Sequence, residues 1–293
     1  MIAMTMNNIS IDEKVIQTNA QNVILKLLTN KHKKNSKTNI RINAIYTEDS
    51  VSKMANNLFN ALNNRQPYEP VSDLSKINDD NVDLANNKAF KDFCINLFTD
   101  DLRRKNNNIY DQLKLSKNIC QFCHGKPTNA LDHYFDKKNS YELAIFPDNL
   151  IPICTDCNSK KGTQTFVYPY LLVLQNPNWL ECTVNANKTF AFSISKNVTK
   201  NSFEHEILSD LQQQFDYLNI FNYYVTSGQA IVTDNISTID QLKHSGFQKE
   251  YTKKFIENKN RDTKEILLQN TEFYKISILN GIISNFNAIW TEL

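Results

Sequence analysis

The chain has 293 residues, of which 41% are hydrophobic and 22% are charged, and its formal net charge at pH 7 is +2. This length and composition predict a globular protein of two or three small folded units and exclude a fibrous or wholly disordered chain. The near-balanced charge excludes a uniformly basic nucleic-acid-binding protein, so any affinity for nucleic acid has to come from local patches.

The N-terminal segment and the cysteines predict the compartment. Asp12, Glu13 and Lys14 precede the first apolar run, which is the wrong order for a signal peptide. No stretch approaches the roughly 18 unbroken apolar residues that are needed to span a membrane. Four of the six cysteines have metal-binding spacing and there is no disulfide framework, which indicates a reducing environment. We therefore expect a cytoplasmic protein without a membrane partner.

The first part of the chain predicts a helical region. Apolar residues recur at helical spacing over residues 11–29 and again over residues 87–117. Ser50 is the predicted N-cap of a further helix between these two segments. Residues 39–46 alternate weakly in polarity and predict a short strand, whereas residues 64–86 are rich in Pro, Asn and Asp and predict a loop.

A basic cluster, Arg103, Arg104 and Lys105, lies close upstream of the first cysteine pair. The planar guanidinium group of arginine matches the geometry of a phosphate group. We therefore predict Arg103 and Arg104 as nucleic-acid contacts.

Two Cys-x-x-Cys pairs are the strongest motif of the chain: Cys120 with Cys123, and Cys154 with Cys157. Four thiolates at this spacing suit a tetrahedral zinc ion. Cys120-Gln-Phe-Cys123-His124 also matches the attachment pattern of c-type haem, but that interpretation leaves the second pair unexplained. The sequence therefore predicts a structural zinc site.

The segment between the two pairs carries further polar residues. Asp132 and His133 are adjacent on an apolar-flanked segment, and Asn149 and Asn158 follow. A carboxylate next to an imidazole can place one group on a divalent metal ion and the other on a water molecule. Phosphodiester hydrolysis needs both of these functions.

Residues 120–162 resemble the zinc-stapled HNH endonucleases. The family pattern runs Cys-x-x-Cys, Asp-His, Asn-Leu, Cys-x-x-Cys-Asn and a nearby Lys, and this chain matches it with Cys120/Cys123, Asp132-His133, Asn149-Leu150, Cys154-Thr-Asp-Cys157-Asn158 and Lys160/Lys161. One departure is Asp136, where many members of the family have proline. That position shapes the loop after the histidine rather than the chemistry.

The resemblance implies a fold and a role for each matching residue. It implies a ββα-metal module with Asp132 and His133 on the first strand and Asn158 at the start of the helix. His133 would be the general base, and Asp132 and Asn158 would hold one Mg²⁺ or Mn²⁺ ion. Asn149 would complete the catalytic set by bonding loop backbone groups and so fixing the orientation of His133.

The two lysines of the motif have two interpretations. Lys160 and Lys161 would contact phosphate if the resemblance extends to the bound nucleic acid. The alternative is an ordinary solvated face of a helix.

The C-terminal part predicts a hairpin followed by helices. Residues 179–184 and 189–195 are strand-like and are joined by a turn at residues 185–187, and from Ser202 onward the apolar spacing is helical. Four tyrosines in the helical part could stack on bases, although aromatic residues at helical spacing more often belong to a core: Tyr217, Tyr223, Tyr224 and Tyr274.

We therefore predict an α+β protein with mainly helical flanks around a central ββα-metal (HNH) nuclease module with a zinc knuckle. The predicted segments are residues 1–108, 109–170 and 171–293. The predicted function is metal-dependent hydrolysis of DNA, with RNA left open as a substrate, and the analogy is to prokaryotic restriction or phage-defence proteins.

Two alternatives remain open at this point. The first is a non-catalytic zinc-dependent module that binds DNA or RNA. The second is the nuclease subunit of a complex in which a separate chain is the ATPase or sensor, because this chain has no Gly-rich phosphate loop of its own.

Overall fold

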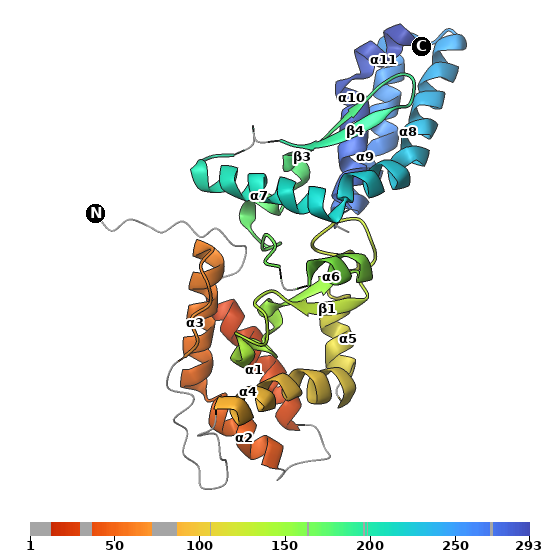
Figure 1. Cartoon of the computed structure of the whole chain (residues 1–293). Helices are drawn as coiled ribbons and strands as arrows, with labels where there is room; N and C mark the ends of the chain where they lie inside the picture. The colour runs from red at the N-terminus through yellow and green to blue at the C-terminus, as the bar shows by residue number, and fades with distance from the viewer. Residues whose placement is uncertain are drawn as a thin grey trace. The chain divides into compact units, whose positions relative to one another are not determined.

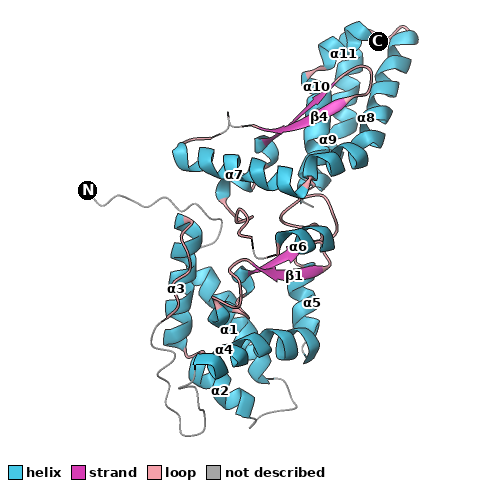
Figure 2. Ribbon diagram, in the orientation of Figure 1, coloured by secondary structure: helices cyan, strands magenta, loops and turns pink. Residues whose placement is uncertain are grey.

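The computed structural model describes residues 13–29, 37–71, 87–105, 107–162, 164–195, 197, 199–269 and 272–293. Within these residues the chain is mixed helix and sheet, with two small two-stranded antiparallel sheets among many helices (Figure 2). The broad α+β class predicted from the sequence is therefore confirmed. None of the helices in this described part is both long and apolar enough to cross a membrane.

The chain divides into two compact units, each described by itself below. The first unit comprises residues 1–117 and 128–172, and the second comprises residues 118–127 and 173–293. Figure 1 colours the chain by residue number, so the elements of each unit can be followed by colour and label. The three-segment division given above stays a prediction.

The first unit begins with helices and continues into a small sheet. Its described elements are α1 (Glu13–Thr29), α2 (Lys37–Ile45), α3 (Glu48–Asn64), α4 (Asn87–Asn96), the π-helix η2 (Leu97–Lys105), α5 (Asn107–Leu115), β1 (Ala130–His133), the 3₁₀ helices η3 (Tyr141–Leu143) and η4 (Pro147–Asn149), β2 (Leu150–Ile153) and α6 (Thr155–Lys161). Helix α1 buries one apolar face at the predicted helical spacing and packs against α3. The helix predicted over residues 11–29 is therefore confirmed over its described residues.

The strand predicted over residues 39–46 is wrong, because this segment forms helix α2. Ile42 and Ile45 of this helix and Tyr46 directly after it are buried, and their spacing of three and four residues suits one helical face. The weak alternation in polarity was therefore a poor guide to this segment.

Helix α3 exists as predicted, but its N-cap is Thr47 rather than Ser50. The Thr47 hydroxyl accepts a hydrogen bond from the backbone N–H of Ser50 at 3.2 Å. Ser50 lies inside the first turn, and its hydroxyl donates to the carbonyl of Ile45. The loop predicted over residues 64–86 holds over residues 66–71, and residues 72–86 lie outside the described part.

The second helical block has an irregular middle. Helix α4 continues as the π-helix η2, and α5 follows. Phe90, Cys94 and Leu97 are buried, as the apolar spacing predicted. A π-helical stretch of this length is uncommon and often marks a functional site. Phe98, near its start, is also buried and faces the site described below.

Strands β1 and β2 form an antiparallel pair, and helix α6 follows β2 directly. Asp132 lies opposite Ile151 and His133 lies opposite Leu150. The Tyr110 hydroxyl of α5 accepts a hydrogen bond from the backbone N–H of Leu131 at 3.1 Å, which ties the sheet to the helical part of this unit.

The second unit is a hairpin packed on helices. Its described elements are η6 (Pro177–Trp179), β3 (Leu180–Val184), β4 (Phe190–Ile194), α7 (Ser202–Leu218), α8 (Ile220–His244), α9 (Lys249–Gln269), α10 (Phe273–Ser284) and α11 (Phe286–Glu292). Both predicted strands of the hairpin are present, and side chains along each alternate between buried and exposed.

Helix α10 lies directly on strand β3 (Figure 1). A Cβ atom at Gly281 would stand 2.1 Å from the carbonyl oxygen of Cys182, so only glycine allows this approach. Ser277 of α10 donates a side-chain hydrogen bond to the carbonyl of Leu180, and Asn285, the residue that caps the end of α10, donates one to the carbonyl of Val184. The helix therefore binds the strand through polar as well as apolar contacts.

Candidate functional site

The first cysteine pair lies in a tight turn. The backbone N–H of Cys120 donates to the carbonyl of Lys126, and the N–H of His124 donates back to the carbonyl of Cys120, both at 2.8 Å. His124 has a left-handed backbone with φ of 44°. Cys120 and Cys123 are fully buried, as expected of thiols that face a common centre.

Three side chains from helices α7 and α8 hold this turn by its carbonyl groups. Tyr224 donates to the carbonyl of Cys123 at 2.5 Å, Tyr223 donates to that of Gly125 at 3.0 Å, and Gln214 donates to that of Phe122 at 3.5 Å. The sequence analysis considered the two tyrosines only as base-stacking or core residues, so this role was missed. No local signal could have revealed it, because the partners lie about a hundred positions away in the chain.

His124, which follows the first cysteine pair directly, is buried. Its ring stacks on that of Phe273, with centroids 4.8 Å apart and planes 21° apart. The Trp179 ring lies on the same histidine at 5.9 Å. His124 therefore belongs to the aromatic core of the second unit.

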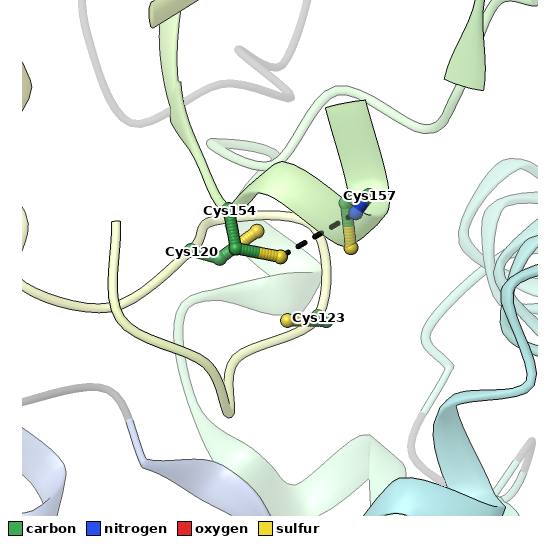
Figure 3. Close-up of side chains that lie close together, drawn as sticks. All are labelled: Cys120, Cys123, Cys154 and Cys157. Carbon is green, nitrogen blue, oxygen red and sulfur yellow. Dashed lines mark hydrogen bonds between the residues drawn. The ribbon is translucent and has the colours of Figure 1, made fainter. Parts of the chain in front are cut away.

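The second cysteine pair lies at the start of helix α6. Cys154 is the N-cap residue, and its Sγ accepts a hydrogen bond from the backbone N–H of Cys157 at 3.5 Å, the contact drawn as a dashed line in Figure 3. Both side chains are buried.

The four cysteines gather as the sequence predicts. Their four Sγ atoms all lie within 4.8 Å of one another, and all four side chains are buried (Figure 3). Four sulfurs around a tetrahedral zinc at the usual Zn–S length stand about 3.8 Å apart, which is within this limit. The cysteines are free thiols rather than disulfides. This group can therefore bind a metal ion such as zinc.

His133 lies at the end of β1 with its ring buried and only 6% of the residue exposed. Its Nε2 lies 3.0 Å from the carbonyl oxygen of Ala144. The Phe98 ring from η2 packs against the imidazole in a T-shaped arrangement, with centroids 4.4 Å apart. The ring is therefore held by a hydrogen bond on one side and by an aromatic contact on another.

Burial sets the charge state of His133. Desolvation is the main cause that lowers the pKa of His133 to about 4. The nearby Lys137 and Lys161 ammonium groups act in the same direction, and the Ala144 carbonyl and Asp132 oppose the shift. The imidazole is therefore neutral at pH 7. A carbonyl oxygen only accepts, so Nε2 carries the proton and Nδ1 carries the lone pair.

Asn149 is completely buried and uses its whole side-chain amide. Its Oδ1 accepts from the backbone N–H of Phe135 at 2.8 Å, and its Nδ2 donates to the carbonyls of Phe135 and Leu143 at 3.2 and 3.3 Å. Phe135 follows His133 by two residues, and Leu143 precedes the Ala144 carbonyl that holds the imidazole. Asn149 thus joins the two backbone segments that flank the ring.

Lys161 is buried, whereas both interpretations of this lysine predict an exposed side chain. The sequence predicts that Lys161 contacts phosphate or belongs to a solvated face, but only 4% of the residue is exposed. Its Nζ lies 2.8 Å from Asp132 Oδ2 and donates to the carbonyl of His133 at 3.2 Å. The ammonium group is buried against both residues of the Asp-His pair.

Asn158 and Lys160 are both exposed on helix α6. Residues three apart on a helix are neighbours, so Asn158 stands beside Lys161. The structure thus brings Asp132, His133 and Lys161 into contact, with Asn158 on the adjoining turn.

The basic cluster lies on the π-helix η2. Arg103, Arg104 and Lys105 are exposed, but Arg104 pairs with Asp100 at 2.6 Å and Lys105 pairs with Asp101 at 3.1 Å. These aspartates offset part of the positive charge. Exposed ion pairs of this kind contribute little to stability.

No protein-family model, curated protein or solved structure matches the chain.

Proposed function

We propose that the chain is a metal-dependent endonuclease that hydrolyses DNA phosphodiester bonds. The observation that carries this proposal is the grouping of Asp132, His133 and Asn149 on a strand–strand–helix unit whose helix bears Asn158. The order of these elements is the order implied by the resemblance to the HNH endonucleases.

His133 is the general base in this proposal. The Ala144 carbonyl holds Nε2–H, so Nδ1 is the nitrogen that takes the proton of the attacking water. Because burial lowers the pKa of His133 to about 4, the neutral form dominates at pH 7, although its basicity is weaker than that of a free imidazole. Phe98 and Ala144 contact the imidazole on other sides, so the attacking water has to approach Nδ1 from a side that neither residue occupies.

Asp132 and Asn158 offer hard oxygen ligands, which suit Mg²⁺ or Mn²⁺. Lys161 engages Asp132 Oδ2, so Oδ1 is the carboxylate oxygen left for the ion. One or two protein oxygens are enough for such an ion when water and phosphate oxygens complete its coordination. A divalent ion held there polarises the phosphate and stabilises the leaving oxygen.

The four-cysteine group has a structural role in this proposal. Four thiolates fill all four positions of a tetrahedral zinc and leave none open for water or substrate. The catalytic ion is therefore a separate, harder ion at Asp132.

A second candidate function is a zinc-dependent nucleic-acid-binding module without catalysis. The burial of the His133 ring and the ion pair between Asp132 and Lys161 favour it, since a purely structural cluster would have both features. Such a module would bind nucleic acid without cleaving it.

The test compares wild-type protein with His133→Asn on duplex DNA, single-stranded DNA and RNA, with Mg²⁺ or Mn²⁺ present. Asparagine is preferable to alanine because the buried site would otherwise keep a cavity. Cleavage should fall by about 10²–10⁴-fold in the variant. The matched control is His244→Ala, whose side chain is 71% exposed. A folded, zinc-loaded His133→Asn protein with a wild-type rate contradicts the proposal, and binding without any cleavage by the wild type favours the second candidate.

A further inference from the structure

Lys161 is a buried cation whose partners are the two residues of the candidate catalytic pair. A lysine is almost never fully buried unless it is paired. Here the ammonium group pairs with the Asp132 carboxylate and also donates to the backbone carbonyl of His133. Only 5% of the Lys161 side chain is exposed, against 24% of that of Asp132. The Asp132 carboxylate is therefore partly exposed to solvent, and the buried Lys161 ammonium group contacts it on the protein side.

Helix α6 determines where this ammonium lies. Cys157 and Lys161 are four residues apart, so they share one face of the helix, and both are buried. Asn158, on the adjoining exposed face, is within one turn of Lys161. Asn158, which offers a ligand oxygen to a divalent ion, and Lys161, whose positive charge repels that ion, therefore lie on the same turn of the helix.

We infer that Lys161 is a positioning residue that offsets the charge of Asp132 before the divalent ion binds. Tight binding of that ion therefore depends on the phosphate group of the substrate. The inference rests on the proposed function, because it needs a divalent ion at Asp132. A doubly charged cation that approaches Oδ1 meets a carboxylate whose charge the Lys161 ammonium already offsets. The negative charge of a phosphodiester restores the balance, so ion and nucleic acid strengthen each other's binding.

A positioning role for Lys161 and a merely structural ion pair lead to different effects of a Lys161 variant on the affinity for metal. A structural pair would stabilise the fold, and its removal would change the free energy of unfolding without raising the affinity for metal. Lys161 as a positioning residue lowers the affinity of the free protein for metal. Its replacement by a neutral side chain should therefore raise that affinity.

The test measures Mn²⁺ binding to the zinc-loaded full chain from the electron paramagnetic resonance signal of free Mn²⁺. In wild-type protein, adding a DNA oligonucleotide should raise the Mn²⁺ affinity at least about tenfold. Without DNA, Lys161→Met should bind Mn²⁺ at least about tenfold more tightly than wild type, and DNA should add less. Lys161→Arg keeps the charge and should bind Mn²⁺ as weakly as the wild type.

Lys160→Met is the matched control. It removes the same charge one position away, from an exposed side chain, and should leave Mn²⁺ affinity without DNA unchanged. If Lys161→Met fails to fold, Lys161→Gln replaces it and keeps a donor for the His133 carbonyl. The wild-type comparison with and without DNA needs no variant at all.

The outcomes separate this inference from the function on which it rests. The inference alone is overturned if the Mn²⁺ affinity is the same with and without DNA, or the same in wild type and in the neutral Lys161 variant. In both cases Asp132→Asn has to abolish the Mn²⁺ binding, which shows that the ion binds at Asp132. If wild-type protein binds no Mn²⁺ at Asp132 under either condition, the proposed nuclease function fails as well.

Discussion

Asn149 holds the backbone of Phe135 at both of its polar groups, accepting from its N–H at 2.8 Å and donating to its carbonyl at 3.2 Å. This pairing fixes the loop that leaves strand β1 directly after His133. A third hydrogen bond, to Leu143, extends it to the segment that holds the imidazole. Asn149 thus joins the two backbone segments that flank the imidazole.

Asn149→Ala should lower the free energy of unfolding by about 2–4 kcal/mol, because buried backbone groups lose their partners. Asn149→Asp keeps the shape but replaces a donor by an acceptor facing two carbonyls, and should cost at least as much. Urea denaturation measures both. Asn139→Ala is the control, since the exposed Asn139 amide bonds only to Asp136 among the contacts described here, and its effect should stay within about 0.5 kcal/mol. A similarly small effect at position 149 would contradict the bridging role.

Zinc content should depend on four cysteines and not on the other two. Cys154→Ala should lose most of the one zinc expected per chain, whereas Cys182→Ala should keep it. Burial raises the pKa of Cys182 to about 12, so it stays a protonated thiol, and only the thiolate ligates zinc. Elemental analysis of the purified proteins measures this directly. Zinc-free wild-type protein that cleaves DNA would contradict the assignment of this site.

The basic cluster should contribute to nucleic-acid affinity through phosphate contacts. Reversing the charge of Arg103, Arg104 and Lys105 should weaken DNA binding and reduce its salt dependence by roughly 0.9 log unit of slope per lost contact. Asp100→Asn is the complementary variant: it frees Arg104 from its 2.6 Å ion pair and should strengthen binding slightly. Fluorescence anisotropy at several salt concentrations measures both effects. An unchanged slope in the charge-reversed protein would place the binding surface elsewhere.

What the sequence predicted well is what short-range spacing determines. The two cysteine pairs, the hairpin around residues 185–187 and the helical periodicity of α1 depend on residues close together in the chain. Long-range packing decided the rest. Lys161 is buried because α6 lies against β1, and the knuckle carbonyls find donors on Gln214 and Tyr224, about ninety to a hundred positions away.

Asp148 should make the stability of the fold depend on pH. Burial raises the pKa of its carboxyl group to about 6, although Asn19 donates to both of its oxygens at 3.1 and 3.2 Å and opposes the shift. The folded protein therefore keeps a proton that the unfolded chain releases near pH 4. The contribution of protonated Asp148 to the free energy of unfolding is fully present below about pH 4. It is lost as the pH rises through about 6, and the loss amounts to about 2–3 kcal/mol.

Asp148→Asn removes this titration, so the difference in unfolding free energy, wild type minus variant, should fall by that amount between pH 4 and pH 7. Asn19→Ala removes the hydrogen bond that opposes the shift and should move the loss to higher pH. Urea denaturation at pH 4, 5, 6 and 7 gives the three curves. Glu142, whose pKa burial also raises, titrates equally in wild type and variant and cancels in the comparison. Parallel curves for wild type and Asp148→Asn would show that this carboxylate ionises in the folded protein as it does in the unfolded chain.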